Sequence, residues 1–271
     1  MYICPVCRMP LVQEGKSFRC GKGHCFDTAR KGYVNLLTTS GHNPKTAGDN
    51  ADMVKARTEF LDRGYYIPLA DAIAAEIGKL SAENVIDSGC GEGFYTVRCA
   101  EDLPDIRFDG IDISKSAVSH CMTRVHQMGL TNCSFAVASS YELPFADNSA
   151  DVIMSVFAPV ANGEYSRVLK KGGHLIIVSP SARHLFELKA AVYDRPYENR
   201  PNDYALDSFE KKDSVICEYQ RNIPSQADIY SLFAMTPYFY KTSEEGMARL
   251  KALDSIDVTC GFEIGIFRNI R

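Results

Sequence analysis

The sequence predicts a doubly wound α/β domain with a mostly parallel sheet, preceded by a small metal-binding domain. Two observations predict this fold class. Strand-like apolar runs alternate with helical stretches from residue 81 onward, and four of the ten cysteines fall within the first 25 residues. A chain of 271 residues is long enough for a large core and an appendage. We expect residues 1–37 to form the metal-binding domain, residues 38–80 a linker with helices, and residues 81–271 the α/β domain.

The α/β domain is organised around a glycine-rich turn within residues 85–96. The apolar pair Val85 and Ile86 is typical of the first strand of a buried parallel sheet, and this strand ends at Asp87. Such a turn lets a ligand lie against backbone amides. Its spacing, G-x-G-x-G, differs from the G-x-G-x-x-G of dinucleotide-binding turns. The three glycines are Gly89, Gly91 and Gly93.

Strands and helices are expected to alternate after this turn. A helix begins at Phe94, and the second strand covers residues 106–111 and ends at Asp112. A carboxylate at that place can accept hydrogen bonds from ribose hydroxyls, because ligands bind at the carboxyl ends of such strands. The next elements are a helix at 116–128 that stops at Gly129, strands at 133–137 and 150–156, a helix to Leu169, and a strand at 174–179.

The parts outside this alternation are less regular. Helical patterns at residues 52–60 and 68–80 precede the sheet, and the Tyr65–Tyr66 pair between them suits either core packing or a lid. Residues 36–48 are rich in Thr, Ser, Gly, Asn and Pro and are expected to form a linker or loop. Residues 194–213 are polar and irregular and are assigned to the substrate side. The last expected elements are a strand at 215–219, a helix at 227–235 and a strand at 262–267.

The N-terminal residues carry a metal-ligand pattern. Cysteines and a histidine in the spacing C-x2-C-x12-C-x3-H supply three thiolates and an imidazole, which can close a tetrahedral zinc site. Four ligands fill the coordination shell, so the zinc is expected to be structural and to stabilise a segment too short to build its own core. Cys25 competes with its neighbour His24 for the place of fourth ligand. The alternative to a zinc site is a small apolar fold in which these cysteines are unrelated. The four candidate ligands are Cys4, Cys7, Cys20 and His24.

Charge is unevenly distributed along the chain. Residues 1–35 hold six basic and two acidic side chains, a net of +4, so the remainder must carry −8 for the whole chain to reach −4. A basic zinc module on an acidic domain is typical of a nucleic-acid-contacting appendage, although an ordinary solvated surface has the same composition. The candidate contacts are Lys16, Arg19, Lys22 and Arg30, with Arg183, Lys189, Arg195 and Arg200 as the alternative set.

Composition places the chain among ordinary soluble proteins. Apolar residues make up 45% and charged residues 24%, and no run of eighteen apolar residues is present to span a membrane. The first residues lack the apolar segment of a signal peptide. The six cysteines after residue 25 have no motif spacing, which favours a reducing compartment over a disulfide framework. We therefore expect a cytoplasmic protein with no membrane partner.

Taken together, the two motifs resemble those of the bacterial 23S ribosomal RNA guanine-N1 methyltransferases of the RlmA family. The glycine turn alone specifies only the superfamily, whereas its union with the N-terminal zinc pattern is much more selective. The similarity reaches from the N-terminus to about residue 190. The matching stretches are the zinc pattern, residues 32–37, 48–57, 60–66, 87–96 and 137–145, and Arg183-His184-Leu185.

This resemblance implies a Rossmann-like class I methyltransferase domain behind a zinc-ribbon-like domain. It implies S-adenosylmethionine (SAM) as cofactor, structural zinc on the four ligands named above, and one guanine in a domain II hairpin of 23S rRNA as substrate. It also allows a homodimer. The family's cofactor contacts carry over to Tyr66, Gly91, Glu92 and His184. Ser139 stands where many members of the superfamily place an Asp against the adenine amino group, so that contact must be weaker or come from the backbone. The complete expected SAM set is Tyr66, Asp87, Gly89, Gly91, Glu92, Gly93, Asp112, Ser139 and His184.

The implied chemistry is an in-line displacement at the sulfonium methyl group, in which positioning supplies roughly 7–11 kcal/mol. Guanine N1 is protonated at neutral pH and lies on the Watson–Crick edge, so the base must be looped out or flipped and must lose that proton. No side chain stands out as the general base. His184 is either that base or a structural histidine beside a helix start.

Two other functions remain open at this level. A small-molecule methyltransferase, such as a quinone-methylating enzyme, shares the glycine turn but gives no role to a basic zinc module. A non-catalytic RNA-binding protein with a degenerate cofactor fold is disfavoured by the intact Asp87, Asp112 and glycines.

Overall fold

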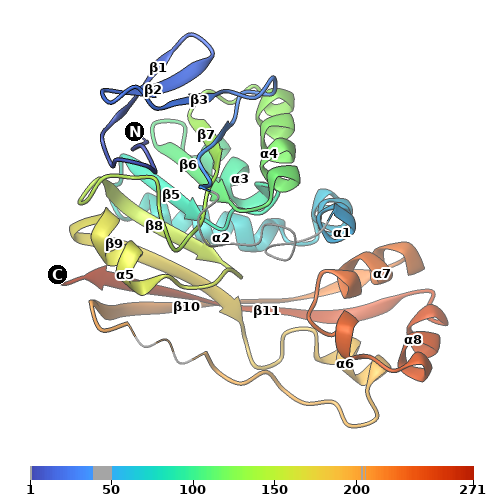
Figure 1. The fold of residues 1–271 in the computed structure, drawn as a ribbon. Helices are drawn as coiled ribbons and strands as arrows, with labels where there is room; N and C mark the ends of the chain where they lie inside the picture. Colours follow the sequence, from blue (N-terminus) through green and yellow to red (C-terminus); the bar gives the residue numbers. More distant parts are fainter. Residues whose placement is uncertain (1, 39–50, 203, 205) are drawn as a thin grey trace.

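The computed structural model describes residues 2–38, 51–202, 204 and 206–271. These residues form an eight-stranded sheet with helices on both faces and a small three-stranded sheet near the N-terminus (Figure 1). The strand order of the large sheet is β10-β11-β9-β8-β5-β6-β7-β4. Pairing is parallel from β9 to β4 and antiparallel among β9, β11 and β10. The predicted fold class, a doubly wound and mostly parallel sheet, is confirmed.

The strands are β1 (Leu11–Glu14), β2 (Ser17–Cys20), β3 (Cys25–Asp27), β4 (Val34–Asn35), β5 (Asn84–Ser88), β6 (Arg107–Asp112), β7 (Cys133–Val137), β8 (Ala150–Val156), β9 (Leu169–Pro180), β10 (Phe209–Ile223) and β11 (Ile256–Asn269). The helices are α1 (Ala51–Asp62), α2 (Ile67–Gly78), α3 (Phe94–Asp102), α4 (Lys115–Met128), α5 (Asn162–Val168), α6 (Phe186–Val192), α7 (Gln226–Ala234) and α8 (Glu244–Lys251), with a 3-10 turn η1 (Phe239–Lys241).

The largest departures from the sequence prediction lie at the C-terminal edge of the sheet. The strands expected at 215–219 and 262–267 are parts of β10 and β11, which are 15 and 14 residues long and pair over their whole length. Residues 209–213, predicted to be irregular, belong to β10, because their backbone pairs with β11. The helices α6 and α8 were not predicted. The loop expected at 36–48 lies largely outside the described residues.

Both faces of the sheet are buried. Alternate residues of each central strand enter different apolar clusters, because successive side chains in a strand point to opposite faces. Val85 and Val152 pack with α1, α2 and α3 and with the C-terminal helices. Ile86 and Ile153 pack with α5 and with the N-terminal domain. Among the described residues, no helix is long and apolar enough to cross a bilayer.

The N-terminal domain is built onto the sheet. Its last strand, β4, pairs in parallel with β7 and so becomes the edge of the large sheet. At its other end the amide of Ile3 donates to the carbonyl oxygen of Pro144 at 2.9 Å, and Tyr2 pairs with Phe145. Figure 1 shows β1, β2 and β3 beside β7 and α4, away from the C-terminal helices. The expected domain boundaries stay predictions, and the two units share one apolar cluster.

We expect Phe145→Ala to lower the free energy of unfolding by about 3–5 kcal/mol, the usual loss for a buried Phe. The Phe145 side chain is buried and its ring centroid lies 5.4 Å from that of Tyr2, so the substitution opens a cavity where the N-terminal domain meets the sheet. Urea unfolding measures the change. Tyr141→Ala is the matched control, because Tyr141 lies in the same loop but is 61% exposed, and its loss should change stability by about 0.5 kcal/mol or less. Equal effects of the two substitutions would contradict the described packing.

Candidate active site and zinc centre

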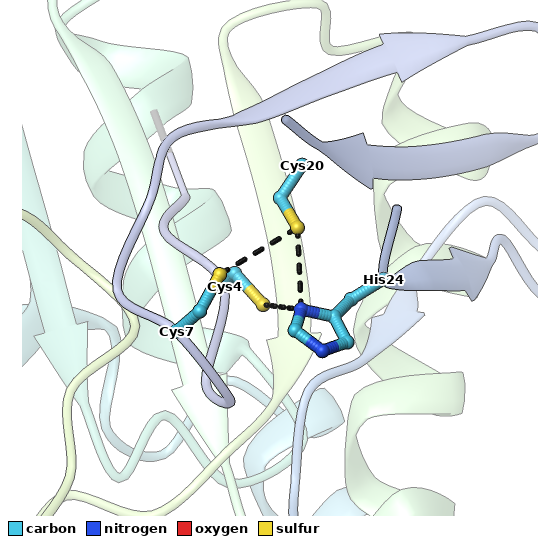
Figure 2. Close-up of side chains that lie close together, drawn as sticks. All are labelled: Cys4, Cys7, Cys20 and His24. Carbon is cyan, nitrogen blue, oxygen red and sulfur yellow. Dashed lines mark hydrogen bonds between the residues drawn. The ribbon is translucent and has the colours of Figure 1, made fainter. Parts of the chain in front are cut away.

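Four side chains of the N-terminal domain converge on one point (Figure 2). Their ligand atoms all lie within 4.8 Å of one another. The Nδ1 atom of His24 lies 3.5 Å from Sγ of Cys4 and 3.3 Å from Sγ of Cys20, and the Sγ atoms of Cys7 and Cys20 are 3.6 Å apart. In a tetrahedral zinc site with the usual bond lengths, ligand atoms are separated by about 3.5–3.8 Å. The donor set and its spacing therefore fit zinc.

The chain folds locally so that these ligands meet. A tight turn follows Cys4, where the amide of Arg8 donates to the Cys4 carbonyl oxygen at 2.8 Å. A second turn follows Cys20, where the amide of Gly23 donates to the Cys20 carbonyl oxygen at 2.9 Å. Cys25, the rival fourth ligand, is exposed and lies outside the cluster. The geometry thus favours His24 over its neighbour.

A large cavity opens at the carboxyl ends of the parallel strands. Its volume is about 740 Å³, enough for a nucleoside-sized ligand together with a second group. One wall is formed by the glycine turn after β5, and the opposite wall by residues between α6 and β10 and by residues after α7. Figure 1 shows α6, α7 and α8 gathered at one end of β10 and β11, on the side toward which β8 and β9 point.

Hydrogen bonds to the end of β6 fix the conformation of the glycine turn. The amides of Gly89 and Cys90 both donate to the carbonyl oxygen of Ile111 at 2.9 Å, and the amide of Gly91 donates to Oδ2 of Asp112 at 3.0 Å. Gly91 has a φ of +55°, and a Cβ placed there would meet only Arg57 Nη1, at 3.6 Å. The turn thus presents an open, side-chain-free face to the cavity.

The comparisons with known proteins found matches for both the N-terminal region and the α/β domain. Residues 79–235 match the family described as "Methyltransferase domain", and residues 2–42 match the family described as "RlmA, N-terminal". The 23S rRNA (guanine(748)-N(1))-methyltransferase of Streptomyces fradiae is 39% identical over 70% of this chain and 66% of that protein. A protein of Bacillus subtilis (strain 168), named for 23S rRNA (guanine-N(1)-)-methyltransferase activity, is 32% identical over 97% of this chain and 95% of its own length. A Micromonospora griseorubida protein with the same kind of name is 30% identical over 98% of this chain and 97% of its own length.

The chain belongs to the RlmA family. Its α/β domain is that of a SAM-dependent methyltransferase, and its N-terminal domain carries a structural zinc site. The cavity fits SAM on independent grounds, because its wall contains two buried polar atoms with no hydrogen-bond partner among the described residues. These atoms are Oη of Tyr66 and Oδ1 of Asp87. Buried polar atoms are rarely left unpaired, so both are suited to a polar ligand.

Two carboxyl groups, those of Asp87 and Glu92, lie in the wall of this cavity, and both are buried. Burial raises the pKa of Asp87 to about 7, and the charges of Asp112 and Glu92 act in the same direction, against a 2.5 Å hydrogen bond from the Thr96 hydroxyl. Burial also raises the pKa of Glu92, against the opposing charges of Arg124 and Arg57. Both carboxyl groups come from the glycine-turn side of the cavity.

His184 lies in the cavity wall as a neutral ring. Burial lowers the pKa of His184 to about 3, and the nearby charge of Lys189 lowers it further. The amide of Gly261 donates to Nδ1 of the ring at 3.4 Å, so the ring proton belongs on Nε2. A ring with this tautomer and this pKa is a poor proton acceptor. The geometry therefore favours the structural role over general-base catalysis.

The structure brings six of the nine expected SAM residues to the cavity wall: Tyr66, Asp87, Gly89, Gly91, Glu92 and His184. The other three lie behind it. Asp112 accepts from the amides of Gly91 and Ser114, and Ser139 accepts from the amide of Tyr141. Gly93 packs against α4, where a Cβ would lie 2.9 Å from Sγ of Cys121.

The opposite wall was not predicted residue by residue. Residues of 194–204 do line the cavity, through Tyr197, Asn199, Asn202 and Tyr204, and residues 235–241 join them. The aromatic spacing in the first stretch was the only signal in the sequence. Lys189, which belongs to the alternative set of nucleic-acid contacts predicted from the sequence, is not available for that role, because its side chain on α6 is fully buried.

For zinc, we expect Cys20→Ser to lose the metal, whereas Cys25→Ser should keep about one zinc per chain. The two cysteines are five residues apart in the sequence, but only Cys20 belongs to the cluster. Metal analysis of the purified proteins by mass spectrometry measures the ratio. Loss of zinc in both variants, or in neither, would contradict the assignment.

For Asp87, the raised pKa predicts a specific pH dependence of stability. The folded carboxyl stays protonated up to about pH 7, whereas an unfolded Asp ionises near pH 4, so the folded state binds the extra proton between these values. This group's contribution to the free energy of unfolding should then fall by about 4 kcal/mol as the pH rises through that window. Asp87→Asn removes the dependence. Unfolding of both proteins without SAM at several pH values gives the difference, and a constant difference would count against the buried carboxyl.

Proposed function

We propose that this chain transfers a methyl group from SAM to N1 of one guanine in a hairpin of domain II of 23S rRNA. The observation that carries the proposal is the union of an RlmA-type zinc domain and a methyltransferase domain in one chain, with relatives named for this activity along nearly its whole length. Similarity over the full length supports rRNA over a small-molecule acceptor. The intact glycine turn and open cavity support catalysis over passive RNA binding.

The residues of the glycine-turn wall would hold the cofactor. Gly89 and Gly91 offer a surface free of side chains, and the buried Asp87 carboxyl and Tyr66 hydroxyl offer unpaired polar atoms. Neutral His184 would donate from Nε2, and Glu92 would act as an acceptor from the turn. Asp112 would act through the turn that it holds, and Gly93 through helix packing; a direct contact from Ser139 stays a prediction. When bound, SAM supplies the sulfonium methyl group.

The opposite wall would receive the guanine. Its aromatic side chains, among them Tyr197 and Tyr240, are 52% and 65% exposed and can stack on a base that has left its helix. Holding the base against this wall also favours in-line alignment of the base with the methyl group. We assign residues 1–37 to an RNA-contacting zinc domain, 38–80 to linker and helices, and 81–271 to the catalytic domain. The homodimer stays a prediction.

The direct test is mass spectrometry of 23S rRNA fragments from cells with and without the protein. We expect one fragment from domain II to gain the mass of one methyl group in the presence of the protein, and its methyl group to lie on N1 of a guanine. Identical fragment masses in the two strains would overturn the proposal.

For the cofactor site, Gly91→Val should weaken SAM binding by at least about a hundredfold, because the new side chain would project into the cavity. Isothermal titration calorimetry measures the affinity. Gly129→Val is the matched control: Gly129 also has a left-handed φ, +66°, and no atoms within 4 Å of an added Cβ, but it lies at the end of α4 away from the cavity. The control isolates the backbone strain that both substitutions share. Near-wild-type affinity in the Gly91 variant would show that the turn is not the site.

For the RNA contact, replacing Lys16, Arg19, Lys22 and Arg30 by Gln should weaken RNA binding and flatten its salt dependence. Each lost phosphate contact should reduce the slope of log K against log salt by about 0.7–0.9. All four side chains are at least partly exposed, and SAM affinity should not change, because the cavity lies elsewhere. A control with the same change of charge replaces Lys79, Lys171, Lys212 and Lys251, which are also exposed. Equal salt slopes for the two quadruple variants would contradict an RNA-contacting zinc domain.

A further inference from the structure

The reaction proposed above requires a proton to leave guanine N1, and no carboxyl group of the described residues lies on the guanine side of the cavity. Among the described residues of its wall, the carboxyl groups are those of Asp87 and Glu92, both on the cofactor side. Glu92 already accepts from the Phe94 amide at 3.2 Å and lies 3.7 Å from Arg124. The His184 ring is neutral, with its Nδ1 already engaged by a backbone amide. With no acceptor on the guanine side, we expect the N1 proton to leave to solvent water, which makes the acidity of N1 important for the reaction.

A buried cation lies directly behind the guanine-side wall. Lys189, on α6, has 0% exposure. Its Nζ donates to the carbonyl oxygen of Tyr197 at 3.0 Å and to Oδ1 of Asn199 at 2.6 Å. The same nitrogen lies 4.6 Å from the ring centroid of Tyr197 and 5.1 Å from that of Tyr238. All three partner residues line the cavity.

Among the described residues, no carboxylate lies within 4.0 Å of Nζ of Lys189, so its charge has no direct partner there. The charged groups around it are already paired elsewhere. Glu198, which stands between the wall residues Tyr197 and Asn199, pairs with Arg183 at 3.8 Å. On α6, Glu187 accepts a hydrogen bond from the Thr259 hydroxyl of β11. From α8, Arg249 pairs with Asp194 at 2.9 Å. A buried charge with no counter-charge in direct contact acts over a longer range than a solvated one.

The field of Lys189 reaches the cavity wall. Its charge lowers the pKa of His184, which is part of that wall. Burial lowers the pKa of Lys189 itself, with the charge of Glu198 acting against this. The groups that join Lys189 to the cavity are aromatic rings and an amide, which carry no charge. The cavity wall also holds two cations: Arg57, whose charge acts on Glu92, and Lys241, which is exposed to solvent.

We propose that Lys189 provides the positive potential that favours the N1-deprotonated form of the bound guanine. This inference rests on the function proposed above. The N1–H bond breaks and the proton passes to solvent water, which leaves a negative charge shared between N1 and O6. The N1 electron pair then forms the bond to the methyl carbon as the carbon–sulfur bond of SAM breaks, and the electron pair of that bond stays on sulfur. Lys189 touches neither reacting atom and acts through space.

The test is the pH profile of kcat for methyl transfer to a 23S rRNA domain II fragment, measured at saturating RNA and SAM, because kcat reports ionisations within the bound complex. Without the cation the apparent pKa of N1 should rise by about one unit, so Lys189→Met should lose about tenfold at pH 7 and approach the wild-type rate above about pH 9.5. Lys189→Gln keeps a donor for Asn199 but no charge, and should show the same shift. Calorimetric SAM affinity near that of the wild type shows that each variant is folded.

Arg249→Met is the matched control. Arg249 also holds α6, by donating to the carbonyl oxygens of Ala191 and Val192, but its charge is paired. Any loss in this variant should be the same at every pH. A loss independent of pH in both Lys189 variants would overturn the proposal, because it would mean that Lys189 only anchors the wall. Failure of the wild-type protein to methylate guanine N1 at any pH would instead overturn the proposed function itself.

Discussion

The pairing of β5 with β6 is the constraint on which the site depends. It places the end of β5 beside Ile111 and Asp112, whose carbonyl and carboxylate oxygens accept three successive amides of the glycine turn. The turn therefore keeps its open face without any ligand. The same pairing buries Asp87, so that its carboxyl is left with one partner and a raised pKa. The cofactor wall is thus preformed by backbone hydrogen bonds, at the cost of one poorly satisfied acidic group.

The two walls of the cavity have different physical characters. The cofactor wall holds both carboxyl groups, whereas the guanine-side wall includes aromatic rings and amides in front of the buried Lys189, and the exposed Lys241. The acidic groups and the buried cation therefore lie on different sides of the cavity. The cation suits an acceptor that must become anionic. The N-terminal zinc domain takes no part in the wall, but through β4 and Tyr2 it forms the edge and part of the core of the same sheet.

The sequence was sufficient to predict the central sheet and the glycine turn attached to it. Residues 133–137 and 150–156 form strands with the predicted bounds, because both are short apolar runs buried on two faces. The elements that the sequence did not predict depend on contacts with distant parts of the chain. β10 is an edge strand whose outer residues are exposed and charged, so only a fragment of it is apolar enough to recognise. β4 has two residues and exists because β7 pairs with it. Nothing in the sequence around Lys189 indicates that its partners would be Tyr197 and Asn199, which a helix and an irregular segment bring together.

The central claim is that this arrangement methylates N1 of guanine and no other position. It is tested most directly by incubating the purified protein with methyl-labelled SAM and an unmodified transcript of 23S rRNA domain II, digesting the RNA to nucleosides, and identifying the labelled product by chromatography and mass spectrometry. We predict that 1-methylguanosine is the labelled nucleoside. Label in 2-methylguanosine, in another base, or in no nucleoside at all would contradict the account.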